Sequence, residues 1–169
     1  MLLTDEVRRY IGFGAMTCSE PVEKGAVRRF AQAIMDEDPK YAEGEPGDRF
    51  GGPIAPPLYP ALMFRRPLGT PDPLAHAADP DYDGLSLATS TGLPDLPLRG
   101  HGLVSAGAEA EFYRYARHGE SVVQHSAYRD IYERESKNGQ PLLFTLIESE
   151  FRTAEGELLL RFRYRYVRR

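Results

Sequence analysis

The segment DEDPKYAEGEPGDRFGGPIAPPLYPALM, from Asp36 to Met63, decides the fold of this 169-residue chain. It passes from an Asp-rich turn into a loop of glycine and proline, and then into an apolar run that predicts a helix from Pro57 to Phe64. Directly before it, apolar residues recur at helical spacing and predict an amphipathic helix from about Gly25 to Met35. The segment therefore joins two short helices through acidic, aromatic and turn-forming residues.

Proline separates this first part of the chain from the rest. Eleven of the fourteen prolines lie between Pro46 and Pro97, which excludes long helices and central strands over most of that interval. After it, apolar residues alternate with polar ones, and a shorter strand at 17–22 precedes the first helix. The alternation predicts four strands, at 104–114, 121–135, 142–153 and 157–167, with turns at His118-Gly119, Asn138-Gly139 and Glu155-Gly156.

Two short helices ahead of a four-strand antiparallel meander predict an α+β fold, because such an order cannot form a parallel doubly wound sheet. The sheet is expected to curve around the helix at Pro57 to Phe64, which is the central helix of the fold. Residues 1–169 are expected to form a single domain. Residues 65–99 are predicted to be a proline-rich insertion, whose length is typical of a lid, a binding loop or disorder.

Composition excludes several classes of function. The net charge of −4 gives no attraction to nucleic acid or to an anionic membrane surface. Cys18 is the only cysteine, so no internal disulfide forms, and no stretch approaches about 20 apolar residues. We expect no signal peptide, because the first residues contain no apolar run of the necessary length. The histidines have no spacing typical of a metal site. We therefore expect a cytoplasmic protein without metal, nucleic acid or membrane among its partners.

The decisive segment resembles the active-site segment of the MaoC-like (R)-specific enoyl-CoA hydratases and dehydratases, most closely their FAS1-type N-terminal domain. In that family the first helix is followed by G-D-x-N-P-L-H, and the next loop ends in I-A-H-G. The matching stretches are Met35 to Tyr41 and Ile54 to Pro57, and His101 to Arg114 is similar to the family's L-H-G…E-F-E-F-Y-R-P. The resemblance covers most of the chain and implies a hot-dog fold, an antiparallel sheet wrapped around a central helix.

Two departures from the family motif bear on chemistry. The resemblance implies that an aspartate and a histidine act on one water, and Asp36 is present whereas Tyr41 stands in place of the histidine. An unperturbed phenol titrates near 10, so Tyr41 cannot replace that histidine as a base at pH 7. The family also holds the thioester oxygen with backbone N–H groups at the start of the central helix. Pro57 has no N–H, which leaves those of Leu58 and Tyr59.

The candidate site residues each have a structural alternative. Asp36 and Tyr41 are the candidate catalytic residues. Alternatively, Asp36 belongs to a polar turn at the end of a helix, and Tyr41 is a packing residue. His101, between two glycines at a strand entry, is either a structural histidine or a substrate contact, and Gly52 either turns the backbone or lets a substrate approach it closely. The candidate substrate-binding residues are Gly52, Pro57, Leu58, Tyr59 and His101.

Arginines alternate along the last predicted strand. Arg161, Arg163 and Arg165 share one face, and apolar and aromatic residues share the other. Two interpretations remain open for the arginine face: a solvated surface, or an anchor for the phosphates of coenzyme A or of an acyl carrier protein.

Three functions follow from these residues and from the resemblance. The first is a subunit of an enoyl-thioester hydratase or dehydratase, a lyase of lipid metabolism, in which a second hot-dog chain supplies the histidine. The second is a self-sufficient hydratase or thioesterase that uses Asp36 with Tyr41 or His101. The third is a non-catalytic acyl-thioester-binding protein. For all three functions we expect a homodimer or heterodimer, no cofactor, and a thioester of coenzyme A or acyl carrier protein as the ligand.

Overall fold

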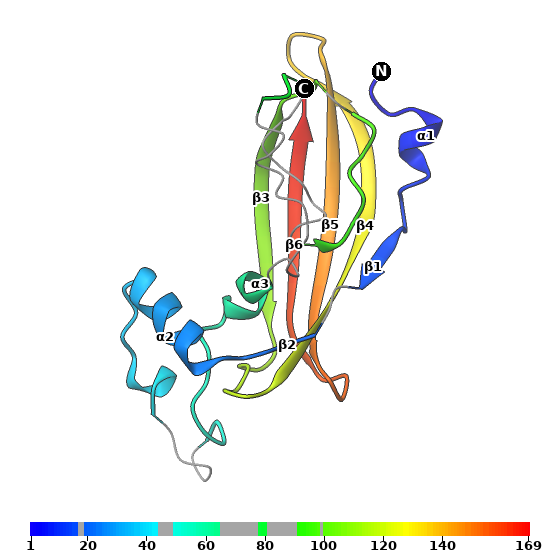
Figure 1. Ribbon diagram of the computed structural model, residues 1–169. Coiled ribbons are helices and arrows are strands. Elements are labelled where there is room, and N and C mark those ends of the chain that lie inside the picture. Colours follow the sequence, from blue (N-terminus) through cyan, green and yellow to red (C-terminus); the bar gives the residue numbers. More distant parts are fainter. Residues whose placement is uncertain (17–18, 44–48, 65–77, 81–90, 99) are drawn as a thin grey trace.

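The computed structural model describes residues 1–16, 19–43, 49–64, 78–80, 91–98 and 100–169. Short helices and strands come first, and four long strands follow (Figure 1). The elements in order are α1 (Asp5–Arg8), β1 (Gly14–Met16), β2 (Glu20–Pro21), α2 (Lys24–Ala33), the 3-10 helix η1 (Pro39–Tyr41), α3 (Tyr59–Met63), β3 (Leu103–Phe112), β4 (Ser121–Glu135), β5 (Pro141–Thr153) and β6 (Leu158–Arg168).

The strands form one antiparallel sheet in the order β1-β4-β5-β6-β3, and β2 also pairs with β4. The four long strands predicted from the alternation are confirmed, but the prediction of a four-strand meander is wrong. β3 pairs with β6, so only β4, β5 and β6 follow one another as neighbours. The chain between β3 and β4 is held across the end of the sheet by a bridge between Ile54 and Arg117, a contact that turn residues alone cannot predict.

The helices are shorter than predicted. The first predicted helix is α2, and the predicted central helix is α3, which begins at Tyr59 because Pro57 and Leu58 form a turn. Of the predicted strand at 17–22, β2 is present at Glu20–Pro21 and residues 17 and 18 lie outside the described part, whereas β1 precedes the predicted range. α1 and η1 were not predicted, since elements of four and three residues are too short to show a period.

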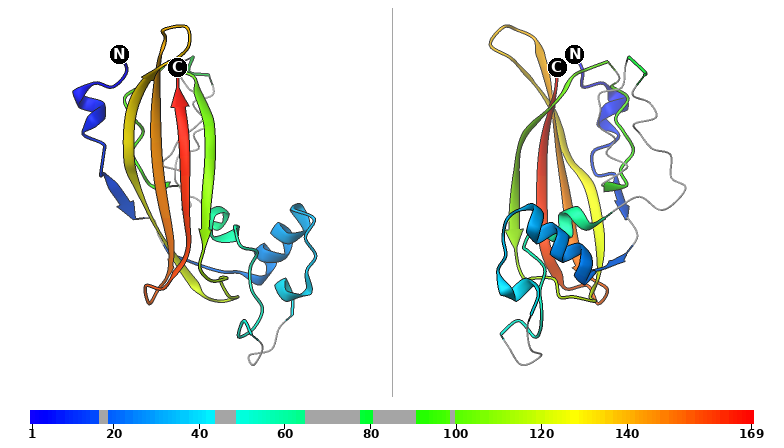
Figure 2. Two further views of the ribbon diagram at one scale, coloured as in Figure 1. Left: turned by 180° about the vertical axis from the view of Figure 1, so that it is seen from behind. Right: turned by 60° about the vertical axis from the view of Figure 1, so that its left-hand side comes forward.

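Two apolar clusters cover the same face of the sheet, which we call the inner face (Figure 2). The first contains α2 and α3 residues and Tyr41, and the second lies toward the chain termini. Part of the predicted insertion belongs to the second cluster, because Leu93, Leu96 and Leu98 are buried there. Residues 65–77, 81–90 and 99 lie outside the described residues, so a lid over the site stays a prediction.

The outer face of the sheet carries three arginines of β6, and each of these three is paired with a glutamate. Burial alone would raise the pKa of Glu150, but hydrogen bonds from Arg152 and Arg161 hold it below its usual value. The arginine face is thus a surface of mutual ion pairs. These pairs are Arg161 with Glu150 at 2.9 Å, Arg163 with Glu148 at 2.8 Å and Arg165 with Glu109 at 3.8 Å.

Candidate functional site

The end of α2 places Asp36. The N–H of Met35 donates to the carbonyl of Gln32 at 3.1 Å, and the N–H of Asp36 donates to the carbonyl of Ala31 at 3.0 Å. This pair of bonds is a Schellman motif, whose central residue must adopt a left-handed conformation. Met35 does so with φ of 56°, as the only non-glycine residue with positive φ in the described part of the chain. It occupies the position at which the hydratase motif has glycine.

The turn after Asp36 places Tyr41. Asp38 caps η1 by accepting a hydrogen bond from the backbone N–H of Lys40 at 3.1 Å, and its carboxylate also pairs with the Lys40 ammonium group. Pro39 suits the first position of such a helix because that position needs no N–H donor. One turn later Tyr41 enters the first apolar cluster, where it is 5% exposed.

Asp36 and Tyr41, the two candidate catalytic residues, meet directly. The Tyr41 hydroxyl donates a hydrogen bond to Oδ2 of Asp36 at 2.9 Å. Burial raises the pKa of Tyr41, and the bond to Asp36 raises it further, so the phenol stays protonated at neutral pH. The pair therefore contains one group able to act as a base, the half-buried carboxylate of Asp36, and one fixed donor that orients it.

The loop of glycine and proline packs against this pair. The N–H of Ile54 donates to the carbonyl of Lys40 at 3.1 Å, and Arg117 donates through Nε to the carbonyl of Phe50 at 2.6 Å. Gly51 packs closely against the guanidinium group of Arg117, since a Cβ atom at Gly51 would be only 3.3 Å from Cζ of Arg117. Gly52 is buried and has φ of 124°, so its role in turning the backbone is evident.

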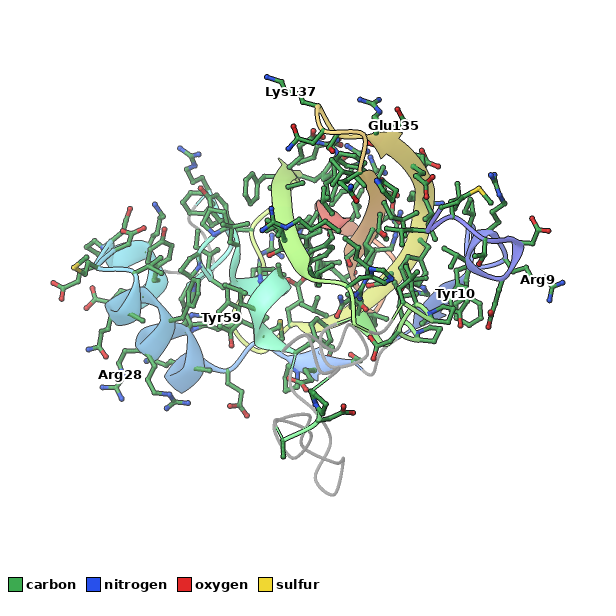
Figure 3. All side chains as sticks on the ribbon, turned by 90° about the horizontal axis from the view of Figure 1, so that it is seen from above. Arg9, Tyr10, Arg28, Tyr59, Glu135 and Lys137 are labelled. Carbon is green, nitrogen blue, oxygen red and sulfur yellow. The ribbon has the colours of Figure 1, made fainter. Side chains whose placement is uncertain are left out.

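The start of α3 contains the backbone donors that are expected to hold a thioester oxygen. The N–H of Tyr59 donates to the carbonyl of Pro56 at 2.9 Å within the turn, and its role as a donor to a thioester oxygen stays a prediction. Pro57 has no N–H, whereas the N–H of Leu58 has no acceptor among the residues that the structure describes. Tyr59 is buried between the helices, with its ring 5.6 Å from that of Phe30 (Figure 3).

His101 lies far from Asp36 and Tyr41. Its carbonyl accepts a hydrogen bond from Arg168 at 3.4 Å, and Leu103 pairs with Arg168 at the end of β6. That end of the sheet carries both chain termini, whereas α2 lies at the other end (Figure 1). The structure therefore does not bring His101 to Asp36, and the idea that these two residues act together has no geometric support.

The histidine that does lie beside the pair is His118. Its backbone N–H donates to the carbonyl of Pro53 at 3.0 Å, and its Nε2 is buried without a hydrogen-bond partner. Burial lowers the pKa of His118, the charge of Lys24 lowers it further, and backbone groups of Ile54 and Tyr41 oppose them. Sequence reasoning missed this residue, because its turn pairs with the loop at Ile54 and carries no motif.

A groove lies near the helices, beside the candidate pair. It has a volume of about 620 Å³ and runs between β2, α2 and α3, and Phe30, Tyr59 and Met63 help to line it. Asp36 and Tyr41 do not line that groove. In the part of the chain that the structure describes, no three His, Cys, Asp or Glu side chains gather as metal ligands would, and no helix is long and apolar enough to cross a membrane.

Comparison with known sequences identifies a family match over nearly the whole chain. Residues 9–162 match the family model described as the FAS1-like dehydratase domain region. That range contains α2, the Asp36–Tyr41 pair and the strands β3 to β5 in full. No curated protein sequence matches the chain.

Solved structures with a similar fold include proteins described as dehydratases and as (R)-hydratases. The MaoC-like dehydratase from Rhodospirillum rubrum is 23% identical with a TM-score of 0.62, covering 94% of this chain and 93% of that one. The ChsH1–ChsH2 complex from Mycobacterium tuberculosis is 19% identical with a TM-score of 0.60, covering 90% and 83%. The HadBC (3R-hydroxyacyl-ACP dehydratase) complex from the same organism is 13% identical with a TM-score of 0.59, covering 94% and 96%. These likenesses confirm the expected α+β hot-dog fold.

Proposed function

Because the chain belongs to the FAS1-like dehydratase domain family, we propose that it is a subunit of an enoyl-thioester hydratase or dehydratase whose catalytic histidine comes from a partner hot-dog chain. Its ligand is an acyl thioester of coenzyme A or of acyl carrier protein. In this assignment the chain provides the acyl-binding surface and the carboxylate of Asp36, and the partner provides the second acid–base group.

The observation that carries the proposal is the hydrogen bond from Tyr41 to Asp36 at 2.9 Å. Hydration of an enoyl thioester needs one group that takes a proton from water and one that gives a proton to the α-carbon. Tyr41 occupies the place of the family's histidine, but the raised pKa of its phenol prevents it from taking a proton from water and makes it a poor proton donor to carbon. The chain thus retains only half of the acid–base pair.

The exposed edge of the sheet supports a partner. β3 is an edge strand, and almost all of its residues are exposed. Val104, Phe112 and Tyr113 are apolar or aromatic and are 46%, 53% and 51% exposed. An open strand edge presents unpaired backbone groups, which a strand from another chain can satisfy. Two of the similar solved structures, ChsH1–ChsH2 and HadBC, are complexes of two different chains.

The test is an assay of the purified protein, alone and together with a hot-dog chain that has the intact D-x-N-P-x-H motif, ideally one encoded beside it. Hydration of crotonyl-CoA is followed by the loss of enoyl absorbance. We expect little turnover by the protein alone and at least a hundredfold more by the complex, since a positioned acid–base group contributes about 10²–10⁴-fold. Equal activity with and without every partner tried would refute the assignment.

A second function, a self-sufficient hydratase, is favoured by one feature. The Asp36 carboxylate is half-buried and already oriented by Tyr41, as a sole acid–base group would need to be. Robust turnover by the protein alone, abolished by Asp36→Asn, would establish this function in place of the first. Tight binding of acyl-CoA without turnover in any combination would instead identify a non-catalytic thioester-binding protein.

A further inference from the structure

Three aromatic rings form a continuous stack along the inner face of β6. The rings of Phe162 and Tyr164 meet edge to face with centroids 4.4 Å apart, and those of Tyr164 and Tyr166 stack at 5.6 Å. Tyr164 lies opposite the buried Ile147 on β5, which places the stack on the inner face. We refer to Phe162, Tyr164 and Tyr166 as the aromatic ladder.

The ladder is only half-buried, unlike the rest of the inner face of β4 and β5. On its β3 side it borders Ala108 and Ala110, which are paired with Tyr164 and Phe162 and are themselves exposed. Methyl groups leave room above a sheet that larger side chains would fill. A partly exposed aromatic surface of about 13 Å therefore runs from Phe162 to Tyr166, at the usual rise of a strand.

The two phenol groups of the ladder are donors without acceptors. Neither the Tyr164 nor the Tyr166 hydroxyl makes a hydrogen bond to any residue that the structure describes. Burial raises the pKa of both tyrosines, so both hydroxyls are protonated at neutral pH. Neither hydroxyl oxygen is among the buried polar atoms that lack a partner in the described part of the chain, so both are accessible to solvent and can donate to a ligand with acceptor atoms.

A polar seam borders the ladder on its other side. The Nε2 of Gln124 donates to Oγ of Ser126 at 3.1 Å, and the hydroxyls of Ser126 and Ser149 are 2.7 Å apart. Ser149 pairs with Phe162, so the seam and the ladder are neighbours across β5 and β6. Gln124 and Ser126 are each 3% exposed and Ser149 is 4% exposed, so the seam is buried and does not itself line a free surface. It makes the sheet beside the ladder polar rather than purely aliphatic.

The ladder joins the two apolar clusters. Phe162 packs against the apolar cluster that contains Tyr41, whereas Tyr166 packs against the second cluster. A thioester whose reacting carbons lie at Asp36 could therefore extend its acyl group from the first cluster toward the second along the ladder. From this continuity we propose that the ladder binds the acyl group and selects an aromatic acyl group that bears an oxygen substituent; this inference rests on the proposed function.

The selection has two physical components. Aromatic rings pack favourably against the edges and faces of other rings, which a flexible aliphatic chain does not reproduce. An oxygen on the ligand ring can accept a hydrogen bond from Tyr164 or Tyr166, whereas an aliphatic chain would cover both hydroxyls and leave them unpaired. The second component is the more selective, because it distinguishes ligands that differ by one atom.

Binding of three saturated coenzyme A thioesters, which cannot turn over, tests the inference by calorimetry. They are 3-(4-hydroxyphenyl)propanoyl-CoA, 3-phenylpropanoyl-CoA and decanoyl-CoA. We expect the hydroxylated ring to bind roughly fivefold tighter than the unsubstituted ring, as one net hydrogen bond allows. The substitution Tyr164→Phe, Tyr166→Phe or both should abolish that difference and should not weaken the binding of decanoyl-CoA, which is expected to tighten because no hydroxyl is then covered and left unpaired.

The matched control is Tyr132→Phe, since Tyr132 stacks on Phe144 at 5.0 Å on the outer face of the sheet. It should leave all three affinities unchanged. If the wild-type protein, with and without its partner, binds none of the thioesters, the proposed function itself fails. If it binds them without preference for the ring oxygen, or if the preference survives both substitutions, the ladder does not select the acyl group. Loss of partner binding in the double variant, with thioester affinities unchanged, would show that the ladder is a subunit contact instead.

Discussion

The hydroxyl of Tyr41 and the carboxylate of Asp36, five residues apart in the chain, meet at 2.9 Å. The Schellman motif at the end of α2 fixes the carboxylate, and the short helix η1 fixes the phenol. The hydratase motif places a histidine where this chain has Tyr41, so the backbone retains the geometry of an acid–base pair after one member has lost its function as a base.

Restoring the histidine should restore chemistry. We expect Tyr41→His to raise the rate of crotonyl-CoA hydration by the isolated protein by about 10²-fold, since imidazole titrates near neutral pH and phenol does not. Steady-state kinetics provide the measurement. Tyr41→Phe is the control, because it removes the hydroxyl without adding a base, and it should give no increase. An unchanged rate in a folded Tyr41→His variant would mean that other parts of the site are missing.

The Asp36–Tyr41 pair could largely be predicted from the sequence, because the types of the two residues and their spacing follow a local motif. Asp36 and Tyr41 come together through helix ends that span a few residues, and local rules describe those well. The long strands were equally predictable, since alternation of apolar residues reports which face of a strand is buried.

Contacts between distant segments were not predictable. The alternation of apolar and polar residues in β3 does not indicate that β3 pairs with β6. Nothing in the sequence near His118 indicates that its turn contacts the loop at Ile54. His101 was singled out because glycines flank it, but its place at the far end of the sheet depends on strand pairing. The same holds for Tyr59, whose N–H donates within a turn that Pro56 begins.

Met35 stores backbone strain next to the candidate site. It is 89% exposed with φ of 56°, so no packing compensates for its left-handed conformation. We expect Met35→Gly to raise the free energy of unfolding by about 0.5–1 kcal/mol, the relieved strain less the added entropy of the unfolded chain. Urea denaturation measures the change. Met35→Ala retains the strain and should give no gain, and an equal gain from both variants would assign the effect to loss of exposed apolar surface.

His118 should make stability depend on pH in a window below its ordinary pKa of 6.5. Its folded-state pKa is lowered, so between 6.5 and that lower value the unfolded chain binds a proton that the folded chain does not. Stability is therefore expected to fall as the pH drops through this window. The glutamates with lowered pKa, such as Glu150, start from 4.5 and do not titrate there.

Chemical denaturation of the wild type and of His118→Asn at pH 7.5 and 5.5 tests this expectation. The variant should lose less stability between the two values than the wild type does. His125→Asn is the matched control, since His125 is exposed on β4. A pH dependence that is the same in wild type and in His118→Asn would contradict the lowered pKa.

The exposed edge of β3 should be the contact with a partner. Phe112 is 53% exposed at one edge of the sheet, and Phe13 is 48% exposed beside β1 at the other edge. Lysine at an edge opposes pairing with another strand because its charge would have to be buried. We expect Phe112→Lys to lower the apparent mass in light scattering toward the monomer, and Phe13→Lys to leave it unchanged. The reverse pattern would place the partner on the β1 edge.

The stretch between α3 and β3 should contain one part that stabilises the fold and another part that determines which ligand binds. Leu93 is fully buried in the second cluster, so Leu93→Ala is expected to lower the free energy of unfolding by about 2–5 kcal/mol. Replacing residues 70–90 with a short Gly-Ser linker should leave the thermal transition in place and alter which acyl-CoA chain lengths bind, as expected for a lid. Scanning calorimetry and binding of acyl-CoAs of increasing length separate the two effects. A linker variant that unfolds would show residues 70–90 to be core packing, and one that binds every chain length as the wild type does would refute the lid.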